Sequence, residues 1–382
     1  MGVVTALVNG RIFTADKLLY QHALLIENGL IVDIVPNHAL PAADHTYDLK
    51  GGLLAPGFID VHVNGGAGEL LNHKPSVKAL RIIAQAHRQY GTTAFIPTLI
   101  TDTWIQMVNA VTAVAAAVDL GVPGILGIHL EGPYLNAERK GVHPPTSIRL
   151  PTTTEDLSHL FESFPPDLIK LMTLAPERVS PEFIQQLTQD GMIVSAGHTA
   201  ATYEQMQVAL AHGVTGFTHL FNAMSPMTSR EPGVVGAALD HADSWCGLIV
   251  DGHHVHPVTL RQAIKAKLRG KMMLVTDAMH TVGEGAGRFD LMGRAIVSEN
   301  GKVTTLDGTL AGSDLDMASA VRNTVQQVGL GLEEALRMAS LYPAQFLKLD
   351  HKLGRIAKGF QADLVLIDDH MVVQQTWIKG QP

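Results

Sequence analysis

The sequence predicts an α/β fold, a (β/α)8 TIM-like barrel with a small β-sandwich domain built from both chain termini. Eight apolar runs between residues 53 and 279 mostly alternate with segments that carry helix signals. Alternating strands and helices imply a parallel sheet, and eight such units is the number of a closed barrel. Both ends of the chain have β character and show no helical period.

The composition is that of a globular protein. Charged residues make up 17% and apolar residues 46% of the 382 residues, which supports a packed interior. A net charge of -8 without a Lys/Arg run argues against a nucleic-acid partner, and no apolar run reaches membrane-spanning length. Because Cys246 is the one cysteine and no signal-peptide pattern is seen, we expect a cytoplasmic protein.

The two ends of the chain are expected to fold together. Asn9-Gly10 and Asn28-Gly29 stand between apolar runs, and Asn-Gly is a strong hairpin signal. Neither end could easily bury a core alone. We therefore expect residues 1–54 and 348–382 to form one small β-sandwich domain beside a catalytic barrel of residues 55–347.

The barrel strands are expected in the eight apolar runs, which lie within residues 53–65, 92–101, 125–134, 168–177, 192–199, 216–224, 245–255 and 272–279. Caps and glycine stops place helices at 76–91, 101–121, 180–191 and 202–213, with another beginning near 313. An open doubly wound sheet would need a phosphate-binding glycine turn after its first strand. The nearest glycine-rich run, 283–287, has the wrong spacing and follows the last strand.

Polar side chains stand where the expected strands end. In a parallel barrel these ends meet on one rim, where active sites lie. The rim residues are His62, Asn64, Glu131, His198, His219, Asn222, Asp251, His253, His254 and Asp277. Two histidines and a carboxylate with an open fourth position are the ligands of a catalytic zinc site, where the metal activates water and polarises a carbonyl. Asp277 could then carry the proton to a leaving amine, which predicts metal-assisted hydrolysis of an amide.

Each of these residues also has a simpler interpretation. A single strand histidine is more often a satisfied core residue than a ligand. His253 and His254 cannot both point inward, because adjacent strand residues face opposite sides. Arg230 is either a solvated loop charge or a bidentate phosphate clamp. Gly312-Ser313 is either a helix cap or part of an anion site.

The motifs identify a family resemblance that extends over essentially the whole chain. They are PGFIDVHVNG, PTLIT, HLEGPYLN, KGVHPP, LAPE, SAGHT, THLFNAMSPM, SREPGVVGA, DGHHV, VTDAM, GTLAGSDLDM and MASLYPA. The chain resembles the amidohydrolase superfamily and, within it, the N-acetylglucosamine-6-phosphate deacetylases. The resemblance implies removal of acetate from N-acetyl-D-glucosamine 6-phosphate to give D-glucosamine 6-phosphate.

The resemblance also implies roles for individual residues. Glu131, His198 and His219 would hold one divalent ion per subunit, with Zn²⁺ first and Fe²⁺, Co²⁺ or Mn²⁺ as alternatives. Asp277 would be the general acid/base and His143 would polarise the acetyl carbonyl. The implied substrate-binding residues are Val142, Asn222, Ala223, Arg230, His254, Leu310, Ala311 and Gly312. The family is dimeric, and Arg230 would reach the neighbouring active site.

The chain departs from the superfamily pattern at the first strand. His62-Val63-Asn64 is intermediate between the His-x-His that binds a second metal and the Gln-x-Asn of one-metal deacetylases, so His62 and Asn64 could form a weaker second site. No lysine matches the superfamily's carboxylated one, since Lys170 lies early in its strand. Two alternatives remain open: the N-acetylgalactosamine-6-phosphate epimer as substrate, and a non-catalytic scaffold that kept the fold.

Overall fold

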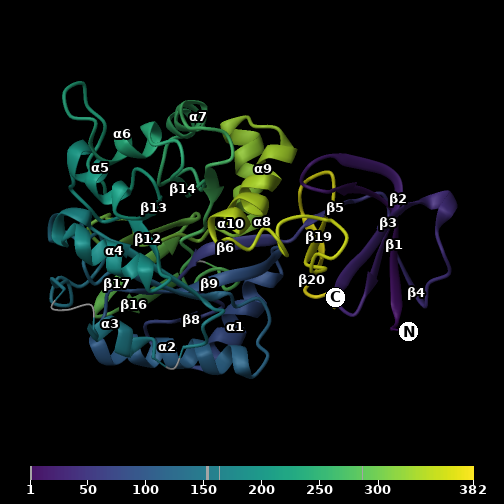
Figure 1. Ribbon diagram of the computed structural model, residues 1–382, viewed down its shortest axis with the longest axis horizontal. Coiled ribbons are helices and arrows are strands. Elements are labelled where there is room, and N and C mark those ends of the chain that lie inside the picture. The colour runs from purple at the N-terminus through teal and green to yellow at the C-terminus, as the bar shows by residue number, and fades with distance from the viewer. Residues whose placement is uncertain (1, 152–154, 163, 286) are drawn as a thin grey trace.

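The structure, a computed structural model, describes residues 2–151, 155–162, 164–285 and 287–382. Figure 1 shows a barrel with a smaller sheet at its side, and both chain ends lie in that sheet. Helices α8 (Met317–Asn323), α9 (Leu332–Ala339) and α10 (Leu341–Phe346) lie on the side of the barrel that faces this sheet. In the described part of the chain, no helix is long and apolar enough to cross a membrane.

Eight parallel strands form the barrel in chain order, as the sequence predicted. They are β6 (Phe58–Val63), β9 (Thr92–Ile100), β10 (Gly127–Glu131), β11 (Ile169–Leu174), β12 (Ile193–Ala196), β13 (Val214–Phe217), β14 (Trp245–Leu248) and β15 (Met272–Leu274). The ring closes just beyond β15, where Val63 bridges Ala278 and the Asp277 N–H donates to the His62 carbonyl at 3.0 Å.

The helices follow the predicted alternation. They are α1 (Val77–Arg88), α2 (Trp104–Asp119), α3 (Glu155–Leu160), α4 (Pro181–Gln189), α5 (Tyr203–Ala211), α6 (Gly233–Asp240), α7 (Pro257–Ala266), α8 (Met317–Asn323), α9 (Leu332–Ala339) and α10 (Leu341–Phe346). Ser76 and Ser180 cap their helices as predicted. The helix expected from 101 begins at Trp104, because Thr103 is the side chain that caps it. The one expected near 313 begins at Met317, because Asp316 accepts the Ser319 N–H.

The chain termini share one seven-stranded sheet, which confirms that they fold together. Its strands are β1 (Val4–Phe13), β2 (Leu18–Glu27), β3 (Leu30–Pro36), β4 (His45–Asp48), β5 (Leu53–Pro56), β19 (Leu364–Ile367) and β20 (Val373–Trp377). Strand β5 joins the two ends, since it pairs with β1 on one side and β19 on the other. The sheet curls until Tyr47 and Trp377 meet edge to face at 5.1 Å between ring centroids, around a core that includes Leu7, Leu24 and Leu364.

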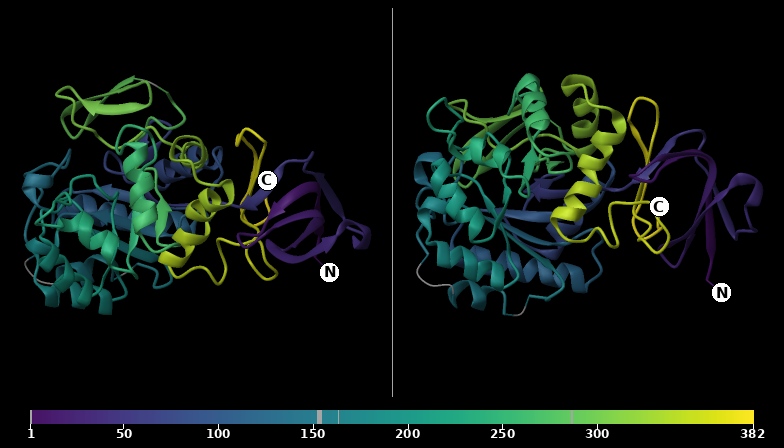
Figure 2. Two further views of the ribbon diagram at one scale, coloured as in Figure 1. Left: turned by 90° about the horizontal axis from the view of Figure 1, so that it is seen from above. Right: turned by 45° about the horizontal axis from the view of Figure 1, so that its top comes forward.

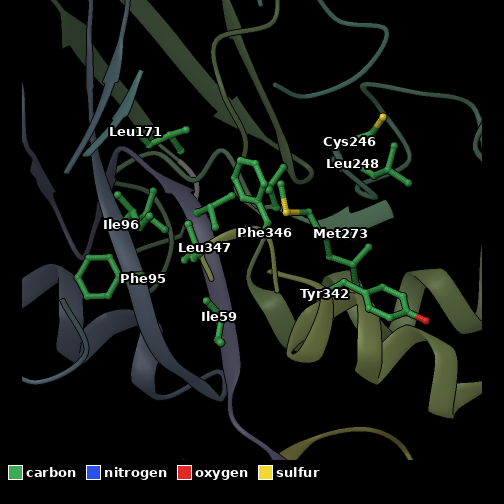
Figure 3. Close-up of a cluster of buried hydrophobic side chains, with 14 of the residues drawn as sticks. Ile59, Phe95, Ile96, Leu171, Cys246, Leu248, Met273, Tyr342, Phe346 and Leu347 are labelled. Carbon is green, nitrogen blue, oxygen red and sulfur yellow. The ribbon is translucent and has the colours of Figure 1, made fainter. Parts of the chain in front are cut away.

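One end of the barrel is filled by apolar side chains, shown in Figure 3. Ile96, Leu171 and Met273 come from three different strands, and Phe346 enters among them from α10. Phe346 is 4% exposed. Burying a side chain of this size contributes roughly 1.5–3 kcal/mol. Because α10 closes this end, the cavity of the barrel opens at the carboxyl ends of the strands.

A three-stranded antiparallel sheet follows β15 and was not predicted, because only the glycine-rich run 283–287 was noted in this region of the sequence. It consists of β16 (Gly287–Leu291), β17 (Arg294–Glu299) and β18 (Lys302–Thr305), and it projects from the barrel in the left view of Figure 2. Leu291, Ile296 and Val303 pack in a small separate core with residues of the barrel rim. A two-residue ribbon, β7 (Gly65–Gly66) with β8 (Glu69–Leu70), lies in the loop after β6.

Candidate active site

Three predicted metal ligands converge at the carboxyl ends of their strands. The Glu131 Oε1 atom lies 3.2 Å from His198 Nε2 and 3.0 Å from His219 Nε2, and the two nitrogens are 3.2 Å apart. All three side chains are buried. A metal with bonds near 2.05 Å in tetrahedral geometry separates its ligands by about 3.4 Å. The spacing of this triad therefore suits one metal ion.

His143 adjoins the triad from the long loop after β10. Its Nε2 lies 3.6 Å from Glu131 Oε2. Potential ligand atoms of Glu131, His143 and His198 lie within 4.8 Å of one another and form an alternative ligand set. The backbone N–H of Thr101 donates to His143 Nδ1 at 3.2 Å. Since Nδ1 accepts, a neutral His143 ring carries its proton on Nε2, which faces the site.

His198 is oriented by a main-chain group. Its Nδ1 lies 2.8 Å from the Arg139 carbonyl, which can only accept, so Nδ1 carries the proton. The Nε2 lone pair is then free on the side of Glu131. Ligating histidines are commonly oriented in this way through the second ring nitrogen.

Asp277 contacts His62 in the first barrel strand and Asn64 directly after that strand. Its Oδ1 accepts a hydrogen bond from Asn64 Nδ2 at 2.7 Å and lies 3.2 Å from His62 Nε2. The same His62 nitrogen is 3.3 Å from Glu131 Oε2. His62 therefore connects the predicted proton carrier to the predicted metal ligand.

Several site residues have a left-handed backbone. The φ angles are 50° at His198, 32° at His219, 51° at Ala223 and 52° at Asp277. Side chains other than glycine rarely adopt this conformation, which is unfavourable by roughly 1–3 kcal/mol and concentrates at functional sites. These residues follow the ends of barrel strands, by two residues at His198 and His219, by three at Asp277 and by six at Ala223.

Burial and mutual charge separate the pKa values of these groups. Burial alone would lower the pKa of His62, but the carboxylates of Asp277 and Glu131 outweigh it and raise that pKa to about 9. Burial would raise the pKa of Glu131, but His62 and the surrounding imidazoles hold it well below its usual value. Burial, with His198 nearby, lowers the pKa of His143 to about 4. In the metal-free protein at neutral pH, His62 is thus the protonated partner of Glu131 and Asp277, and His143 is neutral.

The His62 pKa predicts how the metal-free protein responds to alkaline pH. A folded pKa raised from 6.5 to about 9 contributes stability that is complete below pH 6.5 and is lost as pH rises through 9. The loss corresponds to about 3 kcal/mol of unfolding free energy. Denaturant unfolding of the chelated protein at pH 6.5 and 9.5 measures it. His62→Gln should remove this decline, and an equal decline in the variant and the wild type would contradict the assignment.

A cavity of about 330 Å³ opens above the triad. Its walls include Glu131, His143, His198, His219, Asp277 and Asn64, together with the predicted substrate-binding residues Val142, Asn222, Ala223, His254, Leu310 and Gly312. His254 is fixed by Asp251, whose Oδ2 lies 2.6 Å from His254 Nδ1, whereas His253 is exposed. The volume falls in the range of small-molecule sites.

Two predicted substrate-binding residues do not line this cavity in the described part of the single chain. Ala311 is fully buried beneath it, where its N–H donates to the Val303 carbonyl at 3.1 Å. Arg230 is exposed on the loop before α6. That loop is held firmly, because the Glu231 carboxylate accepts the backbone N–H groups of Tyr203 and Gly233 at 2.9 and 2.8 Å.

Several residues that line the cavity were not predicted from the sequence: Ile100, Glu138, Arg139, Gly141, Met279, Leu291 and Thr309. Arg139 accepts a hydrogen bond from His198 with its backbone carbonyl, and a sequence pattern of side chains cannot reveal such a contact. Leu291 belongs to the unpredicted sheet. The Asn300-Gly301 pair within that sheet was an available hairpin signal.

A closed parallel barrel with histidines and a carboxylate gathered at its strand ends defines a barrel protein of the metal-hydrolase type. Comparison with known proteins agrees. Residues 53–382 match the amidohydrolase family and residues 5–54 match the NagA composite domain. The chain therefore belongs to the amidohydrolase family.

The names of individual relatives point to a more specific activity than the family does. An N-acetylgalactosamine-6-phosphate deacetylase of Shewanella sp. (strain ANA-3) is 44% identical over 97% of this chain and 94% of its own. An N-acetylglucosamine-6-phosphate deacetylase of Haemophilus influenzae is 37% identical over 98% of both chains. The crystal structure of N-acetylglucosamine-6-phosphate deacetylase from Pasteurella multocida superposes with a TM-score of 0.95 at 38% identity, covering 99% of each chain.

Proposed function

We propose that this enzyme removes acetate from N-acetyl-D-glucosamine 6-phosphate and releases D-glucosamine 6-phosphate. The observation that carries the proposal is the convergence of Glu131, His198, His219 and Asp277 on one cavity. Similarity to deacetylases over nearly the whole chain supports it. We also propose a cytoplasmic location, because Cys246 is the one cysteine and no disulfide can form within the chain.

Glu131, His198 and His219 are proposed to hold one divalent metal, with Zn²⁺ preferred. The residues present fit such an ion, because two imidazole nitrogens and a carboxylate oxygen lie 3.0–3.2 Å apart and all three side chains are buried. When bound, the metal would lower the pKa of a water and polarise the amide carbonyl. His62 and Asn64 remain the proposed weaker second site.

Asp277 and His143 are proposed to handle the protons. Asp277 accepts a proton from the attacking water as the oxygen bonds to the acetyl carbon, and it returns that proton to the sugar nitrogen as the carbon–nitrogen bond breaks. Its anchoring by Asn64 keeps the carboxylate aimed into the cavity. The His143 Nε2–H donates to the carbonyl oxygen, where negative charge develops. Acetic acid, which ionises to acetate, and the free amine leave.

The substrate phosphate is proposed to be bound across a homodimer. Asn222 and Ala223 line the cavity of their own chain, whereas Arg230 is exposed on a braced loop and has no ion pair with any described residue. An arginine presented in this way suits bidentate binding of a phosphate in the neighbouring subunit. His254, Val142 and the Leu310–Gly312 segment would complete the sugar site.

Arg230→Ala tests this arrangement. We expect KM for the sugar phosphate to rise by roughly 10–100-fold, because a charge-assisted contact is worth about 1.5–3 kcal/mol. Turnover of unphosphorylated N-acetylglucosamine serves as the control and should not change. Co-expression of Arg230→Ala and Asp277→Asn chains should restore sites that combine an intact Asp277 with the neighbour's Arg230. Failure to restore any activity would mean that Arg230 does not act across the dimer.

The galactosamine epimer is a second candidate substrate, favoured by the 44% identity to the Shewanella deacetylase. Acetate release by the purified protein from both N-acetylhexosamine 6-phosphates tests the proposal. Faster turnover of the glucosamine form is expected. Faster turnover of the galactosamine form would keep the mechanism and overturn the substrate, whereas no turnover of either would favour a non-catalytic scaffold.

A further inference from the structure

A buried histidine that the proposed reaction does not use lies inside the barrel. His129 on β10 is 1% exposed. Its Nδ1 is 3.1 Å from Thr98 Oγ1 on β9, and its Nε2 is 2.7 Å from Thr173 Oγ1 on β11. Thr173 Oγ1 is in turn 2.7 Å from Thr218 Oγ1, directly after β13. We name Thr98, His129, Thr173 and Thr218 the hydroxyl–histidine belt.

The belt runs directly beneath the metal triad. His129 precedes Glu131 by two residues and so lies on the same side of β10. Thr218 precedes His219. At the other end, the Val63 N–H, next to His62, donates to Thr98 Oγ1 at 3.1 Å. The His62 and His129 rings meet edge to face at 4.8 Å between centroids. The belt thus joins the strands that carry His62, Glu131 and His219.

Stability alone does not explain such a belt. A buried polar group is unfavourable unless it is hydrogen-bonded, and replacing both partners of a hydrogen bond by apolar groups of the same shape can be nearly neutral. Apolar side chains in place of the belt would therefore give the barrel about the same stability. Hydrogen bonds differ from apolar contacts in being directional and short-ranged. A chain of them fixes how far neighbouring strands stand from one another.

We propose that His129 is a positioning residue: through Thr98 and Thr173 it fixes Glu131 relative to His62 and His219, and so sets the affinity of the triad for metal. The inference rests on the proposed metal site. Hydrogen-bonding partners behind a metal's ligands typically change metal affinity or activity by 10–100-fold when they are removed. Here the belt would act through the strand backbones, without a hydrogen bond to the ligand side chains.

Thr173→Val and Thr173→Ser form a matched pair, since valine keeps the shape of threonine and serine keeps its hydroxyl. Zinc dissociation constants are measured on metal-free protein by competition with a chromogenic chelator. We expect Thr173→Val to weaken zinc binding by roughly 10-fold or more and to lower kcat with little change in KM. Thr173→Ser should remain near the wild type. Thr98→Val gives an independent test on the other side of His129.

Thr93→Val controls for a general loss of barrel stability. Thr93 is also buried in β9, but its hydroxyl donates to the Phe58 carbonyl, away from the site. This variant should lower the Tm of the metal-free protein without changing zinc affinity. If Thr173→Val and Thr98→Val likewise lower Tm but keep wild-type zinc affinity, the belt is merely structural and the proposal is overturned. Weakened zinc binding in a protein that deacetylates neither sugar phosphate would instead support the belt and overturn the proposed activity.

Discussion

Replacing Asp277 by asparagine is expected to lower turnover by roughly 10²–10⁴-fold, the range contributed by a general acid/base. Asparagine keeps the size of the side chain but cannot accept the proton of the attacking water. The proposed metal ligands do not include Asp277, so metal content should stay at the wild-type level. Acetate release and metal analysis on the same sample measure both effects.

Asp251→Asn is the matched control for this substitution. Asp251 is also a carboxylate at a strand end, but it contacts His254 and does not line the cavity formed by the described residues. Asp251→Asn should raise KM, because it weakens the contact that positions His254. It should lower kcat far less than Asp277→Asn does. Full activity of Asp277→Asn, or loss of its metal, would contradict the proton-carrier role.

Most of the barrel was predictable because its strands are buried on both faces. Such strands appear as continuous apolar runs, and Gly132-Pro133 or Gly197 ends them abruptly. The sheet after β15 escaped prediction because β16 alternates weakly and most of its residues are at least partly exposed. Its packing depends on rim residues that are far away in sequence, such as Leu70 and Ile100.

The convergence of polar residues at the strand ends was predictable, but the full lining of the cavity and its geometry were not. Strand ends identified Glu131, His198, His219 and Asp277, because a parallel barrel brings those ends together. His143 lies in the loop after β10, and its role was implied only by the family resemblance. The proton positions on His143 and His198 depend on main-chain groups of Thr101 and Arg139 that no sequence motif records.

Metal removal is expected to abolish the activity. The proposed ligands Glu131, His198 and His219 lie close enough together to share one ion. The enzyme should therefore require metal absolutely and bind one ion per chain. Glu131→Gln removes the anionic ligand and should stay inactive at every zinc concentration that restores the wild type. His62→Asn should still reach full occupancy with one ion, because His62 belongs only to the proposed weaker site.

The most direct test of the account is zinc titration of metal-free protein while acetate release from the sugar phosphate is followed. We expect no release without metal, a rise in proportion to added zinc, and a plateau at about one ion per chain. Undiminished acetate release from the chelated protein would contradict the proposed role of Glu131, His198 and His219.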